Sequence, residues 1–183
     1  LNPKFNFNLS LFVENYYNGE NYRNSENVLN NFDKNDDLYY WYKIKMKKRI
    51  ISKELGQKQA YNFINSKFKQ IKKPSIKIQF DMANMMKGFT KHQSAINYYN
   101  EVLSKISVNS DSYAEVLFRR GGSYERLKKF EKSDKDLLKS LEINPNDAYV
   151  LNYLAYSWLE RDYKIDAAIE MLQRAYKQKK NDP

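Results

Sequence analysis

Two segments of this chain align with each other: AEVLFRRGGSYERL at residues 114–127 and AYVLNYLAYSWLER at residues 148–161. An apolar, a small and an aromatic position recur after 34 residues, as Leu117/Leu151, Gly121/Ala155 and Tyr124/Trp158. The next matches, Ser133/Ala168, Leu137/Leu172 and Ser140/Ala175, are 35 residues apart. This period is typical of stacked helix–turn–helix units. The second copy is therefore predicted to hold one extra residue in its internal turn, near residues 162–165.

Small residues are expected where the two helices of a unit cross, because a larger side chain would push the backbones apart. Five such residues recur in the predicted second helices: Ser25, Ala60, Ala95, Ser133 and Ala168. They lie 35, 35, 38 and 35 residues apart. The three additional residues before Ser133 are expected in the polar loop at residues 108–112, since surface loops tolerate insertion.

The order of these residue types resembles the tetratricopeptide repeat family. A small residue, an aromatic, a second small residue and a proline arrive in the family's order. The residues that carry the resemblance are Leu117, Gly121, Tyr124, Ser133, Leu137, Ser140 and Pro145, then Leu151, Ala155, Trp158, Ala168, Leu172 and Ala175. The run at residues 151–159 is also similar to a segment of long multi-repeat bacterial proteins, some of them exported or lipid-anchored. Another helical-hairpin array of similar period is the alternative.

The resemblance implies an all-α chain, a right-handed α-solenoid of about five helical hairpins and about ten helices. The hairpins are expected at about residues 5–34, 36–73, 75–107, 110–144 and 146–179. Residues 1–183 are expected to form one solenoid domain, because each unit would bury its apolar face only against its neighbours. The chain begins without methionine and ends on Asn-Asp-Pro, which resembles the cap of another repeat. We therefore interpret it as part of a longer chain.

Composition narrows the possible chemistry. The chain has no cysteine and one histidine, which excludes disulfides, thiolate metal sites and histidine pairs. We expect no enzyme activity, metal or cofactor, and we expect His92 to be an exposed turn residue. No apolar run is long enough for a transmembrane segment. Location stays open between the cytoplasm and the bacterial cell envelope, where the protein would be periplasmic or lipid-anchored.

The family resemblance implies a binding groove on the concave face, which the first helix of each hairpin builds. Residues one turn from the packing positions are expected to line this groove. They are Tyr42, Lys45, Arg49, Lys77, Phe80, Asn84, Lys87, Arg119, Arg126, Tyr149, Asn152 and Tyr156. Aromatic, amide and cationic groups together suit a peptide or protein partner. The last predicted helix, residues 166–179, is apolar for a terminal helix, which predicts that another repeat or a second copy packs there.

The leading hypothesis is a non-enzymatic scaffold or adaptor that binds protein partners. The first alternative is a basic nucleic-acid-binding repeat, because the net charge is +10. That charge also fits a bias towards lysine-rich coding, and the lysines are spread along the chain rather than gathered in a stripe, so nucleic acid is not the expected partner. The second alternative is the regulatory arm of an enzyme that lies outside this sequence.

Overall fold

The computed structural model describes the backbone of residues 3–31 and 37–180, and side chains within residues 8–31 and 40–178. Some predicted features lie outside the described residues. They are the side chains of Phe5 and Phe7 at the start of the hairpin expected at residues 5–34, residues 32–36 where that hairpin ends and the next is expected to begin, and the Asn-Asp-Pro cap at residues 181–183.

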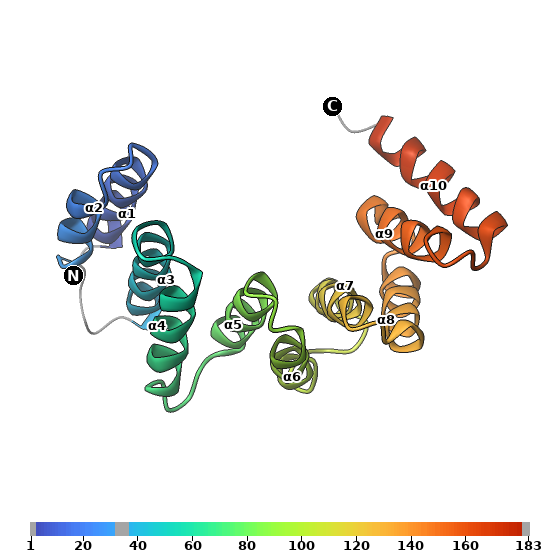
Figure 1. Ribbon diagram of the computed structural model, residues 1–183, viewed down its shortest axis with the longest axis horizontal. Coiled ribbons are helices and arrows are strands. Elements are labelled where there is room, and N and C mark those ends of the chain that lie inside the picture. Colours follow the sequence, from blue (N-terminus) through green and yellow to red (C-terminus); the bar gives the residue numbers. More distant parts are fainter. Residues whose placement is uncertain (1–2, 32–36, 181–183) are drawn as a thin grey trace. The chain divides into compact units, whose positions relative to one another are not determined.

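The described residues form ten α-helices and no strand (Figure 1). The chain divides into two compact units, residues 1–73 and 74–183. The first unit holds α1 (Pro3–Asn18), α2 (Tyr22–Leu29), α3 (Asp37–Glu54) and α4 (Gln57–Lys69). The second holds α5 (Ile76–Gly88), α6 (His92–Leu103), α7 (Asp111–Arg126), α8 (Phe130–Ile143), α9 (Ala148–Leu159) and α10 (Ile165–Lys180).

The predicted fold class, an all-α solenoid of helical hairpins, is confirmed. That all 183 residues form one domain stays a prediction. Among the described helices, none combines the length and apolar character needed to cross a membrane.

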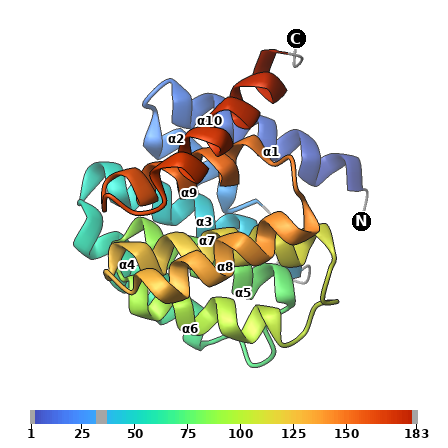
Figure 2. The same cartoon turned by 90° about the vertical axis from the view of Figure 1, so that its right-hand side faces the viewer.

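Consecutive helices pair into five hairpins, α1 with α2 through α9 with α10 (Figure 2). The five small residues predicted at the helix crossings, from Ser25 to Ala168, are all 0% exposed. On the facing helix α7, a Cβ atom added to Gly121 would lie 3.0 Å from Cγ of Leu137 on α8. The two backbones therefore approach as closely as the missing side chain allows.

Every hairpin turn closes with the same backbone bond, an N–H that donates to the carbonyl five residues earlier. The pairs are Asn21 to Tyr16, Gly56 to Ile51, Lys91 to Met86, Lys129 to Tyr124 and Tyr163 to Trp158. Helix α8 begins directly after Lys129, whereas α10 begins one residue later after Tyr163, at Ile165. The extra residue predicted near residues 162–165 is thus confirmed.

The connections between hairpins also follow the predicted spacing. The α6–α7 connection covers residues 104–110, and the α8–α9 connection covers residues 144–147, which is three residues fewer. Ser110 caps α7 by accepting a hydrogen bond from Tyr113 N, and Asp147 caps α9 by accepting from Tyr149 N and Val150 N. These side chains satisfy backbone donors that a helix start leaves open.

We predict that Gly121→Val destabilises the fold, because the branched side chain would meet Leu137 at the α7–α8 crossing. The expected loss is about 1–3 kcal/mol of unfolding free energy, the usual cost of overpacking. Gly88→Ala is the matched control: a Cβ at Gly88 meets nothing within 4 Å. It should be neutral or stabilising by up to about 1 kcal/mol. Urea unfolding followed by circular dichroism measures both, and equal effects would contradict the close crossing.

Candidate functional site

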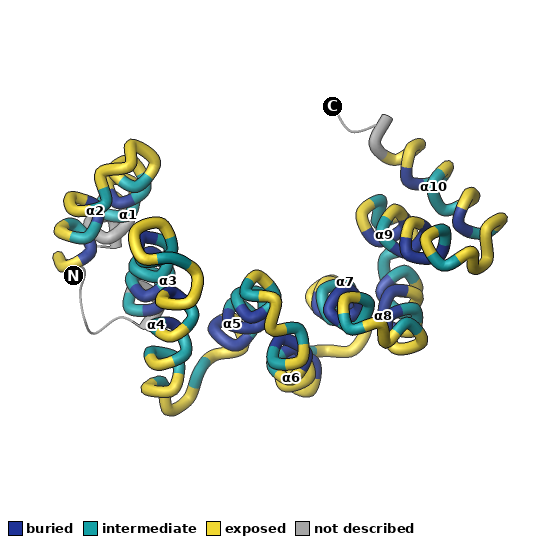
Figure 3. The backbone as a smooth tube through the Cα atoms, viewed as in Figure 1, coloured by how far each residue is buried: buried dark blue, intermediate teal, exposed yellow. Residues whose placement is uncertain are grey.

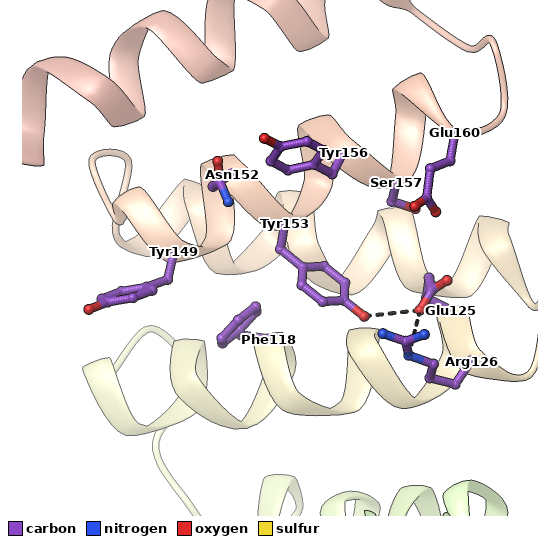
Figure 4. A pocket seen from close by; sticks show the side chains of 9 residues that line it. All are labelled: Phe118, Glu125, Arg126, Tyr149, Asn152, Tyr153, Tyr156, Ser157 and Glu160. Carbon is purple, nitrogen blue, oxygen red and sulfur yellow. Dashed lines mark hydrogen bonds and ion pairs between the residues drawn. The ribbon is translucent and has the colours of Figure 1, made fainter.

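A pocket opens between α7 and α9, the first helices of the last two hairpins (Figure 4). Its volume is about 300 Å³. The lining residues are Phe118, Glu125 and Arg126 of α7, Tyr149, Asn152, Tyr153, Tyr156 and Ser157 of α9, and Glu160 directly after α9. Those on α9 occupy positions i, i+3, i+4, i+7 and i+8 counted from Tyr149, so one side of the helix presents them together. The whole pocket lies within residues 74–183.

Tyr153 lies in the middle of this pocket and is held from two sides (Figure 4). Its ring packs edge-on against Phe118, with ring centroids 5.7 Å apart. Its hydroxyl donates a hydrogen bond to Glu125 Oε2 at 3.0 Å. Burial and the negative charge of Glu125 raise the pKa of Tyr153 to about 12. The phenol therefore stays protonated at neutral pH and keeps donating this bond.

Two exposed tyrosines and an amide surround the held ring. Tyr149 is 70% exposed and Tyr156 is 55% exposed, and Asn152 between them is also exposed. A tyrosine offers an apolar ring with a polar tip, and an asparagine amide can both donate and accept hydrogen bonds. Together these groups match the mixed chemistry of a peptide, in which apolar side chains alternate with backbone amides.

Cations gather at the polar end of the pocket, beside Glu125. Arg126 forms an ion pair with Glu125 at 3.4 Å, yet its side chain remains 63% exposed. A Cβ atom added to Gly122 would lie 3.4 Å from Nζ of Lys87, which reaches over α7 from α5. Burial, followed by the positive charges of Arg119 and Arg126, lowers the pKa of Lys87. Lys87 and Arg126 therefore bring two positive charges to the end of the pocket that also holds the negative charge of Glu125.

Four of the twelve residues predicted to line a groove surround this pocket: Arg126, Tyr149, Asn152 and Tyr156. Sequence reasoning missed the other five lining residues, Phe118, Glu125, Tyr153, Ser157 and Glu160. The 34-residue period could have identified three of them, because each lies 34 residues from a predicted groove residue. Phe118 is equivalent to Asn152, Tyr153 to Arg119, and Glu160 to Arg126. Glu125 and Ser157 match no predicted residue, so the repeat alone does not identify them.

Three of the predicted groove residues, Tyr42, Lys45 and Arg49, lie on α3 in the first unit. Arg49 donates to both carboxylate oxygens of Glu14 on α1, each at 2.9 Å, and its guanidinium lies 4.2 Å from the ring centroid of Tyr17. The Tyr42 hydroxyl donates to a carbonyl of α1, that of Ser10, at 3.4 Å. Arg49 and Tyr42 therefore join α3 to α1, whereas Lys45 is half-buried.

The remaining predicted residues lie on α5 and α7 of the second unit. Asn84 Oδ1 accepts a hydrogen bond from the Tyr99 hydroxyl at 2.7 Å, and Phe80 packs against the same tyrosine. Arg119 lies 5.9 Å from the Phe80 ring centroid and pairs with Glu115. Lys77 is exposed near the start of α5, and Lys87 is half-buried near its end. A role for these residues in binding stays a prediction.

The expectation that His92 is an exposed turn residue is wrong. His92 is the first residue of α6, it is half-buried, and its Nδ1 atom has no hydrogen-bond partner among the described residues. Burial, then the positive charges of Lys87 and Arg126, lower its pKa, and Glu125 opposes this shift. The pKa of His92 therefore depends on the charges at the polar end of the pocket. Across the described residues, no group of three or more His, Asp or Glu side chains could hold a metal ion.

Comparison with known proteins finds a sequence match in one hairpin and a similar fold along most of the chain. Residues 114–147 match the family model described as tetratricopeptide repeat. The structure of MamA from Desulfovibrio magneticus RS-1 is similar, with a TM-score of 0.69 and 11% identity, covering 97% of this chain and 97% of that one. MamA MSR-1 gives a TM-score of 0.66 at 15% identity, covering 97% and 98%. No curated protein sequence matches the chain.

A solved hetero-tetramer also contains this fold. The APC/C hetero-tetramer Cut9–Hcn1 gives a TM-score of 0.63 at 17% identity, covering 93% of this chain and 33% of that one. The prediction of a tetratricopeptide-type helical-repeat protein is therefore confirmed. Proteins with this fold generally mediate protein–protein interactions and are generally not enzymes.

We predict that the pKa of His92, the only histidine of the chain, lies below its ordinary value of 6.5. Its neutral form is favoured in the folded state, so this contribution to stability is present above pH 6.5 and is lost as the pH falls through the folded-state pKa. Arg126→Ala should raise the pKa of His92, and Glu125→Gln should lower it further.

Proton NMR of the single imidazole measures the pKa of His92 directly. Lys139→Ala is the control, because Lys139 pairs with Glu142 on α8 and is not among the groups that shift His92. A pKa of His92 at or above 6.5 in the wild-type protein would contradict the charge arrangement at the pocket.

Proposed function

We propose that this chain is a non-enzymatic scaffold, and that the pocket between α7 and α9 binds an extended segment of a partner protein. One observation carries the proposal: exposed Tyr149 and Tyr156 flank a cavity of about 300 Å³ whose central ring, Tyr153, is already fixed. Because the Tyr153 ring is already fixed, less conformational entropy is lost when a segment binds against it. The exposed tyrosines add a large contact area with few rotatable bonds.

The chemistry of the pocket suggests what the partner segment offers. An apolar or aromatic side chain would lie against Phe118 and Tyr153, while the Asn152 amide would bond the segment's backbone. An acidic group of the segment would lie at the polar end of the pocket, where Arg126 is largely exposed and Lys87 is half-buried. The partner is therefore expected to be a short segment that carries an apolar residue and a carboxylate.

The pocket lining favours protein over nucleic acid. Glu125 and Glu160 both line it, and Tyr153 adds a hydroxyl that Glu125 already engages. Arg126 is the one cation in this lining, so the pocket lacks the row of cations that binds the phosphates of a nucleic acid. Titration with an oligonucleotide at two salt concentrations separates the two functions, because binding to phosphates weakens steeply as salt rises.

Peptides selected from a random library against the wild-type chain provide the test ligand. We expect Tyr149→Ala combined with Tyr156→Ala to weaken the selected peptides by about tenfold or more, since central interface tyrosines often contribute about 2 kcal/mol. Tyr176→Ala is the matched control, because Tyr176 is also 70% exposed but lies on α10, outside the pocket lining. Arg49 is unsuitable for this test, because Glu14 holds its guanidinium.

Peptide affinity for each variant is measured by fluorescence anisotropy, and circular dichroism checks that the helices are intact. Equal affinity for the wild type and the double variant would overturn the pocket assignment. Failure of the library to yield any peptide that prefers the wild type over the double variant would overturn it as well.

We also propose that copies of the chain associate through α10. Ile165, Ile169 and Tyr176 on this helix are 47%, 45% and 70% exposed. An exposed row of large apolar side chains is a common mark of an interaction surface.

A further inference from the structure

One serine hydroxyl in the lining of the α7–α9 pocket has no hydrogen-bond partner. Ser157 of α9 is 6% exposed, and its Oγ atom is buried and unpaired among the described residues. Buried and exposed positions follow each other along α9 (Figure 3), and only one of the buried residues carries a hydroxyl. The buried residues are Val150, Leu151, Leu154, Ala155, Ser157 and Trp158.

Three other described residues also carry a buried side-chain nitrogen or oxygen atom without a partner. They are His92, Ser133 and Trp158. None of these three is among the residues that line the pocket. A missing hydrogen bond and a cavity therefore coincide at Ser157.

The equivalent serine one hairpin earlier does have a partner. Ser123 of α7 lies 34 residues before Ser157, and its hydroxyl donates to the backbone carbonyl of Arg119 at 3.2 Å. A serine inside a helix commonly pairs in this way, with the carbonyl four residues before it. Ser157 does not form the corresponding bond to the carbonyl of Tyr153. The position in the repeat therefore does not by itself leave this hydroxyl unpaired.

An unpaired hydroxyl that water does not reach destabilises the free protein, because folding removes the hydrogen bonds that it makes to water in the unfolded chain. A ligand group that pairs with Ser157 Oγ would remove this penalty on binding, and the gain would appear as affinity. Figure 4 shows Ser157 on the side of α9 that faces Glu125 of α7. Since a serine Oγ moves between staggered positions by rotation about one bond, it can turn towards the cavity.

The charged residues of the lining indicate which kind of group would pair with Ser157. These are Glu125, Arg126 and Glu160, and the first two form an ion pair with each other. Glu160 lies three residues after Ser157, on the same side of the helix. An ionised carboxylate accepts hydrogen bonds and does not donate them, so a carbonyl oxygen placed beside it would be repelled and an N–H group attracted. The surroundings of Ser157 thus favour a hydrogen-bond donor.

We infer that Ser157 Oγ accepts a hydrogen bond from a main-chain N–H of the bound segment. The inference rests on the proposed function of the pocket and names the atom that fixes the segment's backbone there. Every residue except proline offers a main-chain N–H. The bond therefore sets where the segment lies along α9 rather than which side chain it carries, and it excludes proline at one position of the segment.

Ser157→Ala tests the inference because its effects on folding and on binding differ in sign. Loss of an unpaired hydroxyl should leave the midpoint of urea unfolding unchanged or raise it, since alanine also favours a helix. The peptides selected against the wild type should bind about tenfold more weakly, because their N–H loses its acceptor. Ser133→Ala is the matched control: that hydroxyl is equally buried and unpaired, but it lies on α8 outside the lining. It should keep the wild-type affinity.

A change in the peptide tests the same bond from the other side. Each backbone amide of one selected peptide is replaced in turn by an ester, which removes one N–H, and fluorescence anisotropy measures its affinity for the wild type and for Ser157→Ala. At one position the ester should weaken binding to the wild type about tenfold and have little further effect on Ser157→Ala, because both changes remove the same bond. The selected peptides should carry no proline at that position.

The contradicting results keep this inference apart from the proposed function. If the double change of Tyr149 and Tyr156 to alanine weakens the peptides but Ser157→Ala does not, the pocket stands and the role of Ser157 is overturned. Weaker binding to Ser157→Ala with no coupled ester position would overturn the main-chain bond, and a lowered urea midpoint would show that the hydroxyl has a partner in the free protein. Equal affinity for the wild type and the double tyrosine variant would overturn the pocket assignment, and this inference with it.

Discussion

The structure depends on the close crossing of two helices within each hairpin. One small residue per second helix, fully buried in all five hairpins, lets the backbones approach. Gly121 shows how little space remains, since an added Cβ would lie 3.0 Å from Leu137. Because an isolated hairpin cannot bury both of its apolar faces, it must pack against its neighbours in the chain. The crossing therefore sets the geometry of each unit, and the stacking of units supplies the core.

Polar contacts between successive hairpins vary, while a small buried residue recurs at the helix crossing within every hairpin. Lys47 of α3 pairs with Glu26 of α2, and Arg120 of α7 donates to Asn100 of α6. Residue 154, the equivalent of Arg120 in α9, is an apolar leucine. Because the contacts between hairpins do not require the same residues in every unit, the exposed residues of the first helices can also differ from one hairpin to the next. On α7 and α9 these residues line the pocket, which combines the fixed Tyr153 ring with exposed tyrosines and the polar end beside Glu125.

The sequence predicts the hairpins well because their requirements are local. Small residues at fixed spacing, a proline after a helix, and residues that cap helices identify the units, their order, and even the extra residue in the last turn. Side-chain partners on helices far apart in the sequence carry no such pattern. The pairing of Arg49 with Glu14, the bond from Tyr99 to Asn84, and the half-buried site of His92 depend on packing between helices. The pocket is an intermediate case, since the repeat period points to Phe118, Tyr153 and Glu160 but not to Glu125 or Ser157.

The central claim is that each hairpin gains its stability from its immediate neighbours. Native-state amide hydrogen exchange, residue by residue and at concentrations too low for association, tests it most directly. The account predicts that amides of α7 and α8, which have a hairpin on both sides, are the most protected in residues 74–183, and that protection falls towards α10. Protection of α10 equal to that of α7 and α8 would contradict the account, because it would require packing that a series of stacked hairpins does not provide.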